Sequence, residues 1–234
     1  MPDQPDARVR RTVRSYVLRG GRLTPAQQRA LDDLLPRFGV PPGDGRLNLE
    51  ALFGRRAEVI LEIGFGTGES TWRMAAAEPE RDFIGVEVHA PGVGRLLLSL
   101  REHGLENVRV AVQDVVGFLA NRVPSGSLGG VRIYFPDPWP KKRHHKRRLI
   151  QPPFVALLAE KMAPGAVLHL ATDWQEYADH MLEVLGASPA FENLSPGGDW
   201  CERPAWRPAT RYERRGVRLG YATRDLLFRR TRDA

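Results

Sequence analysis

Short apolar runs alternate with segments of helical periodicity between residues 58 and 185, and this alternation constrains the fold more than any other feature. Apolar runs bounded by glycine, proline and polar residues predict strands. Strands that alternate with helices form a parallel sheet, because each helix returns the chain to the end of the sheet at which the previous strand began. The pattern therefore predicts a doubly wound α/β fold. The expected strands are 58–63, 82–88, 108–112, 131–135 and 167–171, and the expected helices are 67–77, 91–103, 115–123, 153–162 and 175–185.

The segments on either side of this region follow other patterns. Residues 1–22 are polar and arginine-rich, which is typical of an arm that orders on an anionic partner or only solubilises the chain. The Thr24-Pro25-Ala26-Gln27 segment predicts a helix start with a capping box. A short helix is expected over 48–54, and residues 190–194 and 221–230 predict two final strands that could pair antiparallel at one edge.

The composition limits the class of protein. The formal net charge is +7, and six lysines and arginines with two histidines fill the eight positions from Lys141 to Arg148. Such a local excess indicates an anion-binding surface. The single cysteine, Cys201, excludes an intramolecular disulfide and disfavours a cysteine metal site. Because we find no membrane-length apolar run and no signal peptide, we expect a cytoplasmic protein without a membrane partner.

A glycine-rich turn, Gly64-Phe65-Gly66-Thr67-Gly68, joins the first expected strand to a helix. Glycines let a ligand approach the backbone closely, and Glu87 at the end of the second strand could accept hydrogen bonds from ribose hydroxyls. The spacing is neither that of a dinucleotide site nor that of a P-loop. An adenosine cofactor without a pyrophosphate, S-adenosylmethionine, is therefore expected, and Asp114 after the third strand could reach its adenine.

Glu62 interrupts the apolar run of the first strand. Burying a carboxylate without a partner is costly, so we expect a cationic or N–H partner for it. One interpretation is a contact to the cationic cofactor or its surroundings. The other is a structural salt bridge.

Two further carboxylates follow neighbouring strands. Asp137 lies between two prolines after the fourth strand, and Asp173 follows the fifth. Because ligands bind at the carboxyl ends of parallel strands, both could flank the reactive end of the cofactor. Asp173 could also cap the following helix.

The basic run has two interpretations as well. Lysine and arginine clusters are usually solvated faces, but this run directly follows Asp137, and Trp139 offers a surface for base stacking. We therefore expect His144 and His145 to face RNA, with no metal bound. His169 is expected in the core. The Thr210–Gly216 segment combines groups suited to a base or ribose with arginines suited to phosphate.

Taken together, these segments resemble the bacterial tRNA (guanine-N7-)-methyltransferase family. The resemblance runs from Leu61 to Gly216, and the Phe-Pro-Asp-Pro-Trp block with its basic tail is its most specific part. The matching segments are Leu61–Gly68 (LEIGFGTG), Gly85–His89 (GVEVH), Phe135–Arg148 (FPDPWPKKRHHKRR), Ala171–Trp174 (ATDW) and Thr210–Glu213 (TRYE).

The resemblance implies a seven-stranded, mostly parallel class I methyltransferase sheet (Rossmann-like) in one catalytic domain, residues 23–234, after the arm 1–22. It implies transfer of a methyl group from S-adenosyl-L-methionine to N7 of a tRNA guanine, usually in the variable loop at position 46. The implied cofactor residues are Glu62, Gly64, Gly66, Gly68, Glu87, Asp114 and Asp137, with Asp137 also catalytic. The implied substrate residues are Lys141, Asp173, Thr210, Arg211, Tyr212 and Glu213. The implied RNA contacts are Arg143, His144, His145, Lys146, Arg147 and Arg148.

Two alternatives to this reading of the sequence remain open. One is a methyltransferase that acts on another RNA or on a protein, because the basic run by itself does not select tRNA. The other is a non-enzymatic RNA-binding protein, which the intact glycine turn and acids disfavour. The chain could act as a monomer or a homodimer.

Overall fold

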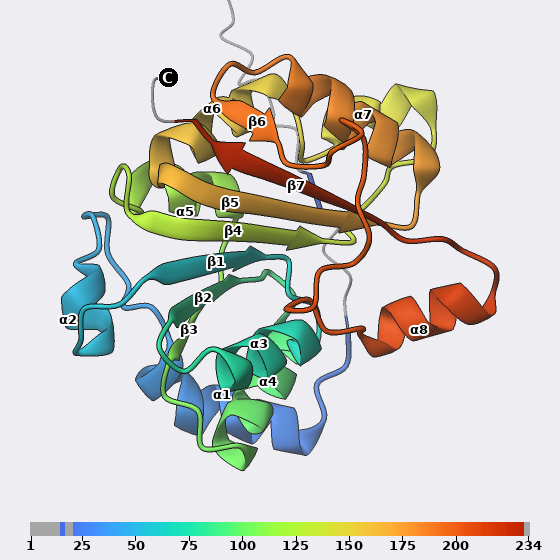
Figure 1. Cartoon of the computed structure of the whole chain (residues 1–234). Coiled ribbons are helices and arrows are strands. Elements are labelled where there is room, and N and C mark those ends of the chain that lie inside the picture. Colours follow the sequence, from blue (N-terminus) through green and yellow to red (C-terminus); the bar gives the residue numbers. More distant parts are fainter. Residues whose placement is uncertain (1–14, 17–20, 232–234) are drawn as a thin grey trace, which may run out of the picture.

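The computed structural model describes residues 15–16 and 21–231, so most of the expected arm 1–22 lies outside the described residues. A seven-stranded sheet with the order β3-β2-β1-β4-β5-β7-β6 runs through the molecule (Figure 1). Its strands are β1 Val59–Ile63, β2 Asp82–Val86, β3 Val108–Ala111, β4 Leu128–Tyr134, β5 Met162–Thr172, β6 Phe191–Asn193 and β7 Arg224–Arg230. The α-helices are α1 Pro25–Phe38, α2 Leu49–Phe53, α3 Glu69–Ala77, α4 Ala90–Glu102, α5 Val115–Asn121, α6 Pro152–Lys161, α7 Gln175–Gly186 and α8 Arg211–Arg218, and Lys142–Arg147 forms the 3-10 helix η1.

The sheet is mostly parallel. Strands β3, β2, β1, β4 and β5 pair in parallel, and β7 runs antiparallel to both β5 and β6. The predicted doubly wound fold and the predicted antiparallel final pair are therefore confirmed. The strand order reverses between β1 and β4, which is where open α/β sheets bind their ligands.

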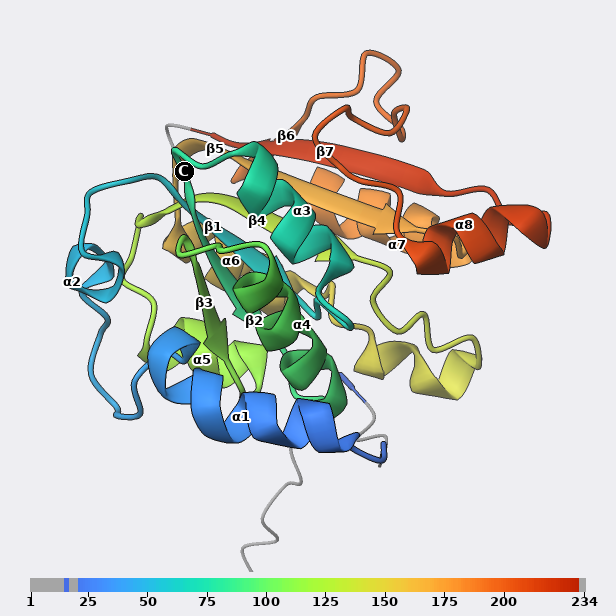
Figure 2. The ribbon, with the colours of Figure 1, turned by 90° about the horizontal axis from the view of Figure 1, so that it is seen from below.

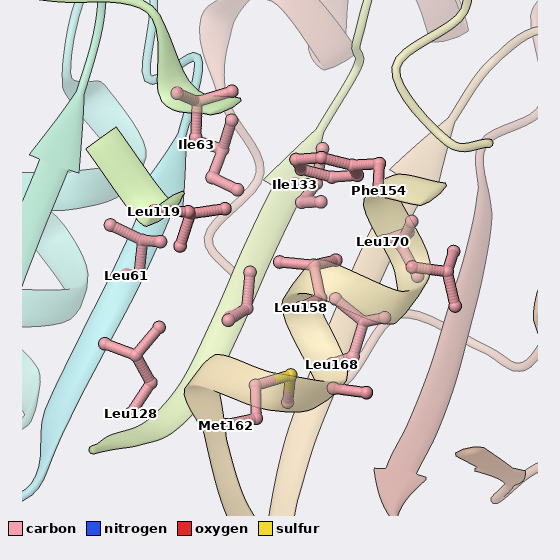
Figure 3. Close-up of a cluster of buried hydrophobic side chains, with 14 of the residues drawn as sticks. Leu61, Ile63, Leu119, Leu128, Ile133, Phe154, Leu158, Met162, Leu168 and Leu170 are labelled. Atoms are coloured by element: carbon pink, nitrogen blue, oxygen red, sulfur yellow. The ribbon is translucent and has the colours of Figure 1, made fainter. Parts of the chain in front are cut away.

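Apolar side chains alternate between the two faces of the sheet. Leu61 and Ile63 of β1 belong to a cluster with residues of α5 and α6 (Figure 3), to which α7 also contributes. Ile60, on the opposite face, belongs to a second cluster with residues of α1, α3 and α4. Helix α1 lies alongside α4 on that face (Figure 2). Both sides of the central strands are thus buried, as their continuous apolar runs predict.

Helix α1 begins where the sequence predicts. The Thr24 hydroxyl accepts a hydrogen bond from the Gln27 N–H at 3.2 Å, and the Gln27 side chain accepts one from the Thr24 N–H at 2.9 Å. This reciprocal capping box satisfies two N–H groups that the helix leaves unpaired. None of the helices in the described ranges has the length and apolar character needed to cross a membrane.

Two short helices were not expected from the sequence. Residues 142–147 form η1 and residues 211–218 form α8, where the sequence indicated only charged motifs. Helix α8 projects beyond the ends of β5 and β7 (Figure 1), and Glu213 is its only buried residue. Neither helix has the apolar stripe by which a helix that packs on a core is usually recognised.

Gly92 in the first turn of α4 provides a test of the packing between this helix and the glycine turn. A Cβ at Gly92 would lie 2.0 Å from the backbone oxygen of Gly66, whereas a Cβ at Gly186 would meet nothing within 4 Å. We expect Gly92→Ala to lower the free energy of unfolding by about 1–3 kcal/mol through overpacking. Each kcal/mol lost should lower the melting temperature by roughly 2–4 °C. Thermal denaturation followed by circular dichroism measures this. The control Gly186→Ala should melt at or above the temperature of the unaltered protein, and equal melting of the two variants would contradict the expectation.

Candidate active site

A cavity of about 340 Å³ lies at the carboxyl ends of β1, β2 and β4, beside the reversal of strand order. Its wall includes backbone from the glycine turn and the carboxylates of Glu87 and Asp137. The lining residues are Ser15, Tyr16, Ile63, Gly64, Gly66, Val86, Glu87, Val88, His89, Gln113, Val115, Ile133, Phe135, Pro136, Asp137 and Leu149. The fold therefore brings acids from two strand ends to one partly apolar cavity.

The three glycines of the turn serve two purposes. Gly64, Gly66 and Gly68 all have positive φ, at 70°, 58° and 76°, which other residues rarely adopt. Gly64 and Gly66 line the cavity, and a Cβ on either would meet nothing within 4 Å. A Cβ on Gly68 would lie 2.6 Å from Leu96 of α4, so this glycine permits close helix packing and is not among the lining residues.

Glu87 fixes the shape of the turn. One carboxylate oxygen accepts a hydrogen bond from the Gly66 N–H at 2.9 Å. The other accepts from the N–H groups of Val88 at 2.7 Å and His89 at 3.0 Å. The carboxylate therefore ties the end of β2 to the glycine turn while it lines the cavity.

Glu62 is buried on β1, behind the glycine turn, with an exposed fraction of 1%. Its Oε1 accepts a hydrogen bond from the Ser70 hydroxyl, and its Oε2 is buried without a hydrogen-bond partner. Burial raises the pKa of Glu62, although the hydroxyls of Ser70 and Thr71 oppose the shift. The hydrogen-bond partner is thus a hydroxyl and not the expected N–H or cation, while the positive charge of Arg132 acts on Glu62 without forming an ion pair and opposes the rise in pKa. None of the ion pairs found among the described residues includes Glu62, so the alternative of a structural salt bridge receives no support.

Asp114 lies at the edge of the cavity and caps α5. Its carboxylate accepts a hydrogen bond from the Gly117 N–H at 3.1 Å. Asp114 is not among the residues that line the cavity, whereas its neighbours Gln113 and Val115 are. We expected Asp114 to reach the adenine, and the lining of the cavity does not bear this out, because the residue after β3 that carries a polar side chain into the lining is Gln113.

Asp137 lines the cavity within a sharply bent segment. Phe135 and Trp139, two residues to either side, both have positive φ, at 52° and 47°. Non-glycine residues in this region are strained, and such strain gathers at functional sites.

Asp173, after β5, is not among the cavity-lining residues. Its Oδ2 accepts a hydrogen bond from the Tyr212 hydroxyl at 3.2 Å. The N-cap of α7 is Trp174, without a side-chain cap, so the alternative that Asp173 caps this helix is wrong. Burial and the nearby Asp173 carboxylate raise the pKa of Tyr212 to about 12, which keeps the phenol a proton donor.

The Thr210–Glu213 motif forms the start of α8. The Thr210 hydroxyl accepts a hydrogen bond from the Glu213 N–H at 3.2 Å, as a helix cap does. The Glu213 carboxylate is buried and accepts two hydrogen bonds from Arg207, at 2.7 and 2.8 Å. The Tyr212 ring packs against Phe135 with 5.0 Å between centroids. Thr210 and Glu213 thus hold the helix, and Tyr212 faces the segment that leads to Asp137.

The basic run divides into exposed and buried parts. Lys141, Lys142, Arg143 and Lys146 are exposed, and His144, His145 and Arg147 are half-buried. Arg148 is 3% exposed, and its guanidinium donates to the Pro138 backbone oxygen at 3.0 Å and to Glu176 at 3.2 Å.

A buried guanidinium with partners inside the protein supports η1, which differs from the RNA contact that we expected of Arg148. Trp139 is also less available than expected, because the Arg147 guanidinium lies 3.9 Å from its ring centroid. Partial burial and the neighbouring cations, chiefly Arg143 and Arg147, lower the pKa of His144.

Several residues at the site escaped the sequence analysis. Ser15 and Tyr16 line the cavity, and the Trp139 indole donates to the Ser15 backbone oxygen at 3.1 Å. His169 is buried as expected, but it belongs to a polar network, because it lies 2.8 Å from Asp225 and 3.0 Å from the Tyr134 hydroxyl. No motif marked these residues, since their contacts join distant segments. Within the described part of the chain, no cluster of three or more His, Cys, Asp or Glu could hold a metal ion.

Comparison with known proteins identifies close relatives. A family model described as "Putative methyltransferase" matches residues 56–226. A tRNA (guanine-N(7)-)-methyltransferase of Alcanivorax borkumensis is 53% identical over 226 residues, which cover 97% of this chain and 95% of the relative. Proteins of the same name from Aromatoleum aromaticum and Aeromonas hydrophila are 54% and 51% identical, over 98% and 96% of this chain and 88% and 95% of their own.

Solved structures share the fold at much lower identity. The 16S rRNA methyltransferase KamB superimposes with a TM-score of 0.54 at 15% identity, covering 83% of this chain and 99% of KamB. The antibiotic-resistance methyltransferase Kmr gives a TM-score of 0.52 at 17% identity, covering 80% of this chain and 93% of Kmr. These similarities establish the fold, a class I methyltransferase sheet, and carry nothing about the substrate.

The unpartnered oxygen of Glu62 predicts a stability effect. Because burial raises its pKa, the ionised side chain opposes folding at neutral pH. Glu62→Gln should therefore raise the free energy of unfolding at pH 7.5. Each kcal/mol of that increase should raise the melting temperature by about 2–4 °C. The gain should shrink as the pH falls through the raised pKa of folded Glu62, and it should vanish only below the ordinary glutamate pKa, where Glu62 is protonated in both the folded and unfolded chains. Calorimetry between pH 5 and pH 8 measures it. The exposed Glu192, paired with Arg229, gives the control Glu192→Gln, and a Glu62→Gln protein that melts lower than this control would contradict the account.

Proposed function

The chain belongs to the tRNA (guanine-N7-)-methyltransferase family, and we propose that it transfers the methyl group of S-adenosylmethionine to N7 of a guanine in tRNA. The observation that carries the proposal is the placement of Asp137. This residue lines the same cavity as Gly64 and Gly66 of the glycine turn, and four residues later the exposed cationic run begins. One short segment therefore joins a cofactor-sized cavity to a polyanion-binding surface.

The cavity fits the cofactor. S-adenosylmethionine, when bound, supplies a methyl group on a positively charged sulfur. Gly64 and Gly66 offer open backbone to the cavity, and Glu87 offers a carboxylate at the end of β2, the position suited to ribose hydroxyls. Glu62 adjoins the glycine turn without lining the cavity, and its buried Oε2 has no donor; we assign this oxygen to the cationic ammonium group of the cofactor. We assign Gln113 to the adenine edge in preference to Asp114, whose carboxylate caps α5.

The guanine needs no base to activate it. N7 is an acceptor on an exposed edge of the base and carries a free lone pair. With the cofactor held by the cavity residues, this pair would accept the methyl group, and the electron pair of the carbon–sulfur bond would stay on sulfur, which would leave as a neutral thioether. No proton has to leave, and positive charge arrives on the base. Catalysis is then mainly positioning together with stabilisation of that charge.

Asp137 is our first choice for the group that meets this charge. It lines the cavity, and the proline on each side restricts its backbone. Asp173 is the second choice, and its hydrogen bond to Tyr212 ties it to α8. Lys141, Arg211 and Tyr212 remain proposed substrate contacts at the exposed mouth of this region, while Thr210 and Glu213 act by holding α8.

The exposed cations would hold the RNA backbone. Lys142, Arg143 and Lys146 of η1 are exposed, and α8 exposes Arg215 and Arg218. Contacts from such side chains to phosphates supply affinity and orientation and carry little sequence information. We therefore propose that the surface recognises tRNA by shape, with the target base turned out toward the cavity.

Methyl transfer to unmodified tRNA with nucleoside analysis of the product tests the function. The unaltered protein should form 7-methylguanosine, and its absence, or methylation only of another RNA, would overturn the proposal. In the same assay Asp137→Asn, which keeps the shape and removes the charge, should lower kcat by about 10²–10³-fold. The control Asp179→Asn, at an exposed position of α7, should leave kcat unchanged. Normal turnover by Asp137→Asn would contradict the proposal that the Asp137 carboxylate stabilises the positive charge on the guanine.

The salt dependence of tRNA binding tests the role of η1. Replacing Arg143 and Lys146 by Ala should weaken binding and reduce the slope of log K against log salt by roughly 1 for each phosphate that is no longer neutralised. The matched control replaces Arg56, which precedes β1, and Arg101, in the last turn of α4, both toward the amino ends of the parallel strands and away from η1. Filter binding over a range of salt concentrations measures the slopes. Equal slopes for the two double variants would exclude a phosphate role for η1.

A further inference from the structure

Helix α8 is held to the rest of the protein through its first turn. Its first residue, Arg211, donates its backbone N–H to the Glu69 carboxylate at 2.7 Å. Its second, Tyr212, bonds Asp173 at 3.2 Å, and its third, Glu213, bonds Arg207. The remaining residues of the helix are half-buried or exposed. These three tethers therefore determine where the helix with the proposed substrate contacts lies.

One of these tethers comes from the cofactor side of the sheet. Asp173 follows β5, and Arg207 lies in the connection between β6 and β7. Glu69, in contrast, is the first residue of α3 and directly follows Gly68, the last glycine of the turn. Its two oxygens reach 142 and 145 residues along the chain, to the Arg211 N–H and, at 3.1 Å, to the Arg214 guanidinium.

The chemistry of this contact favours a charged Glu69. Partial burial alone would raise the pKa of Glu69, but the Arg211 N–H and the Arg214 guanidinium outweigh it, and the pKa is lowered. Glu69 also completes the cap of α8. Thr210 accepts from the Glu213 N–H, and Glu69 accepts from the Arg211 N–H, two donors that the helix itself leaves unpaired. A carboxylate at this end of a helix is further stabilised by the helix dipole.

The glycine turn that carries Glu69 is itself fixed from the cavity. The Gly66 N–H is held by Glu87, and Gly64 and Gly66 form part of the cavity wall. A ligand that restrains this wall would also restrain the start of α3, which directly follows the turn. The start of α3 would in turn restrain the start of α8 through the bond between Glu69 and the Arg211 N–H.

We propose that Glu69 is a positioning residue that couples occupation of the cofactor cavity to the placement of α8, so that cofactor and tRNA strengthen each other's binding. This rests on the proposed function, because it takes α8 as part of the guanine site. Such a coupling is reciprocal and usually amounts to about 5–150-fold in affinity. Order passes from the cavity wall to the guanine site through one carboxylate.

The test compares the affinity for tRNA of the free protein with that of the protein whose cavity is saturated with the demethylated cofactor. Unmodified tRNA is titrated by fluorescence anisotropy in the absence and presence of S-adenosylhomocysteine, and the ratio of the two dissociation constants is the measured quantity. We expect a ratio of about 5 or more for the unaltered protein and a ratio near unity for Glu69→Ala. Glu69→Gln, which keeps an acceptor for the Arg211 N–H but loses the charge, should fall between them.

Arg214→Gln provides a second route to the same answer, should Glu69→Ala fail to fold. It removes the Arg214 half of the tether with Glu69 intact, and it should lower the ratio to about the Glu69→Gln value. If Arg214 served only to bind a phosphate, its replacement would lower the tRNA affinity by the same factor with and without S-adenosylhomocysteine, and the ratio of dissociation constants would stay unchanged. The control Glu192→Gln, at the exposed ion pair with Arg229, should keep the ratio of the unaltered protein.

The outcomes separate the two proposals. An unaltered protein that forms 7-methylguanosine but has a ratio of unity, or Glu69→Gln and Arg214→Gln variants with an unchanged ratio, would overturn the coupling and leave the function intact. An unaltered protein that neither binds nor methylates tRNA would overturn the function itself.

Discussion

The reversal of strand order between β1 and β4 is the constraint on which the site depends. Strands β2 and β4 lie on opposite sides of β1. The connections that follow β1 and β4 therefore run to opposite faces of the sheet, and the cavity lies between them at the carboxyl ends of the strands. Every proposed cofactor group is attached to this edge. The glycine turn follows β1, Glu87 follows β2, Gln113 follows β3 and Asp137 follows β4. The chemistry is thus spread over distant segments that a single backbone arrangement brings together.

Buried charges organise the two sides of the site differently. On the cofactor side, one oxygen of Glu62 is buried without a partner. A ligand that donated a hydrogen bond to it would offset the cost of burying it. On the substrate side, the buried guanidinium of Arg207 bonds both Glu213 and Asp225, and Asp225 also contacts His169. A fully paired network of this kind specifies one arrangement, because removing any partner would leave a buried charge alone. This network therefore fixes the position of the Glu213 side chain, whereas the Glu62 side chain on the cofactor side still lacks a partner for one oxygen.

Much of the fold could be predicted from the sequence. The strands ending at Ile63 and Val86 are buried on both faces, so their apolar runs give a strong signal, and the capping box at Thr24 is purely local. Helix α8 could not be predicted, because five of its eight residues are charged, it has no apolar stripe, and its order comes from tethers such as Glu69 and Arg207. The roles of Glu213 and Arg148 could not be predicted for the same reason: a motif does not tell whether a charged side chain points outward or into an ion pair.

The sequence by itself determined the α/β class, the glycine turn with its acids, and the family, because these depend on local patterns and fixed spacings. Only the tertiary structure decided which of the predicted residues line the cavity. It placed Gln113 there and Asp114 at a helix cap, left Asp173 bonded to Tyr212, and buried Arg148 beneath the basic run. The physical reason is that burial and pairing of a polar group are set by segments far away in the chain, which a local pattern does not contain.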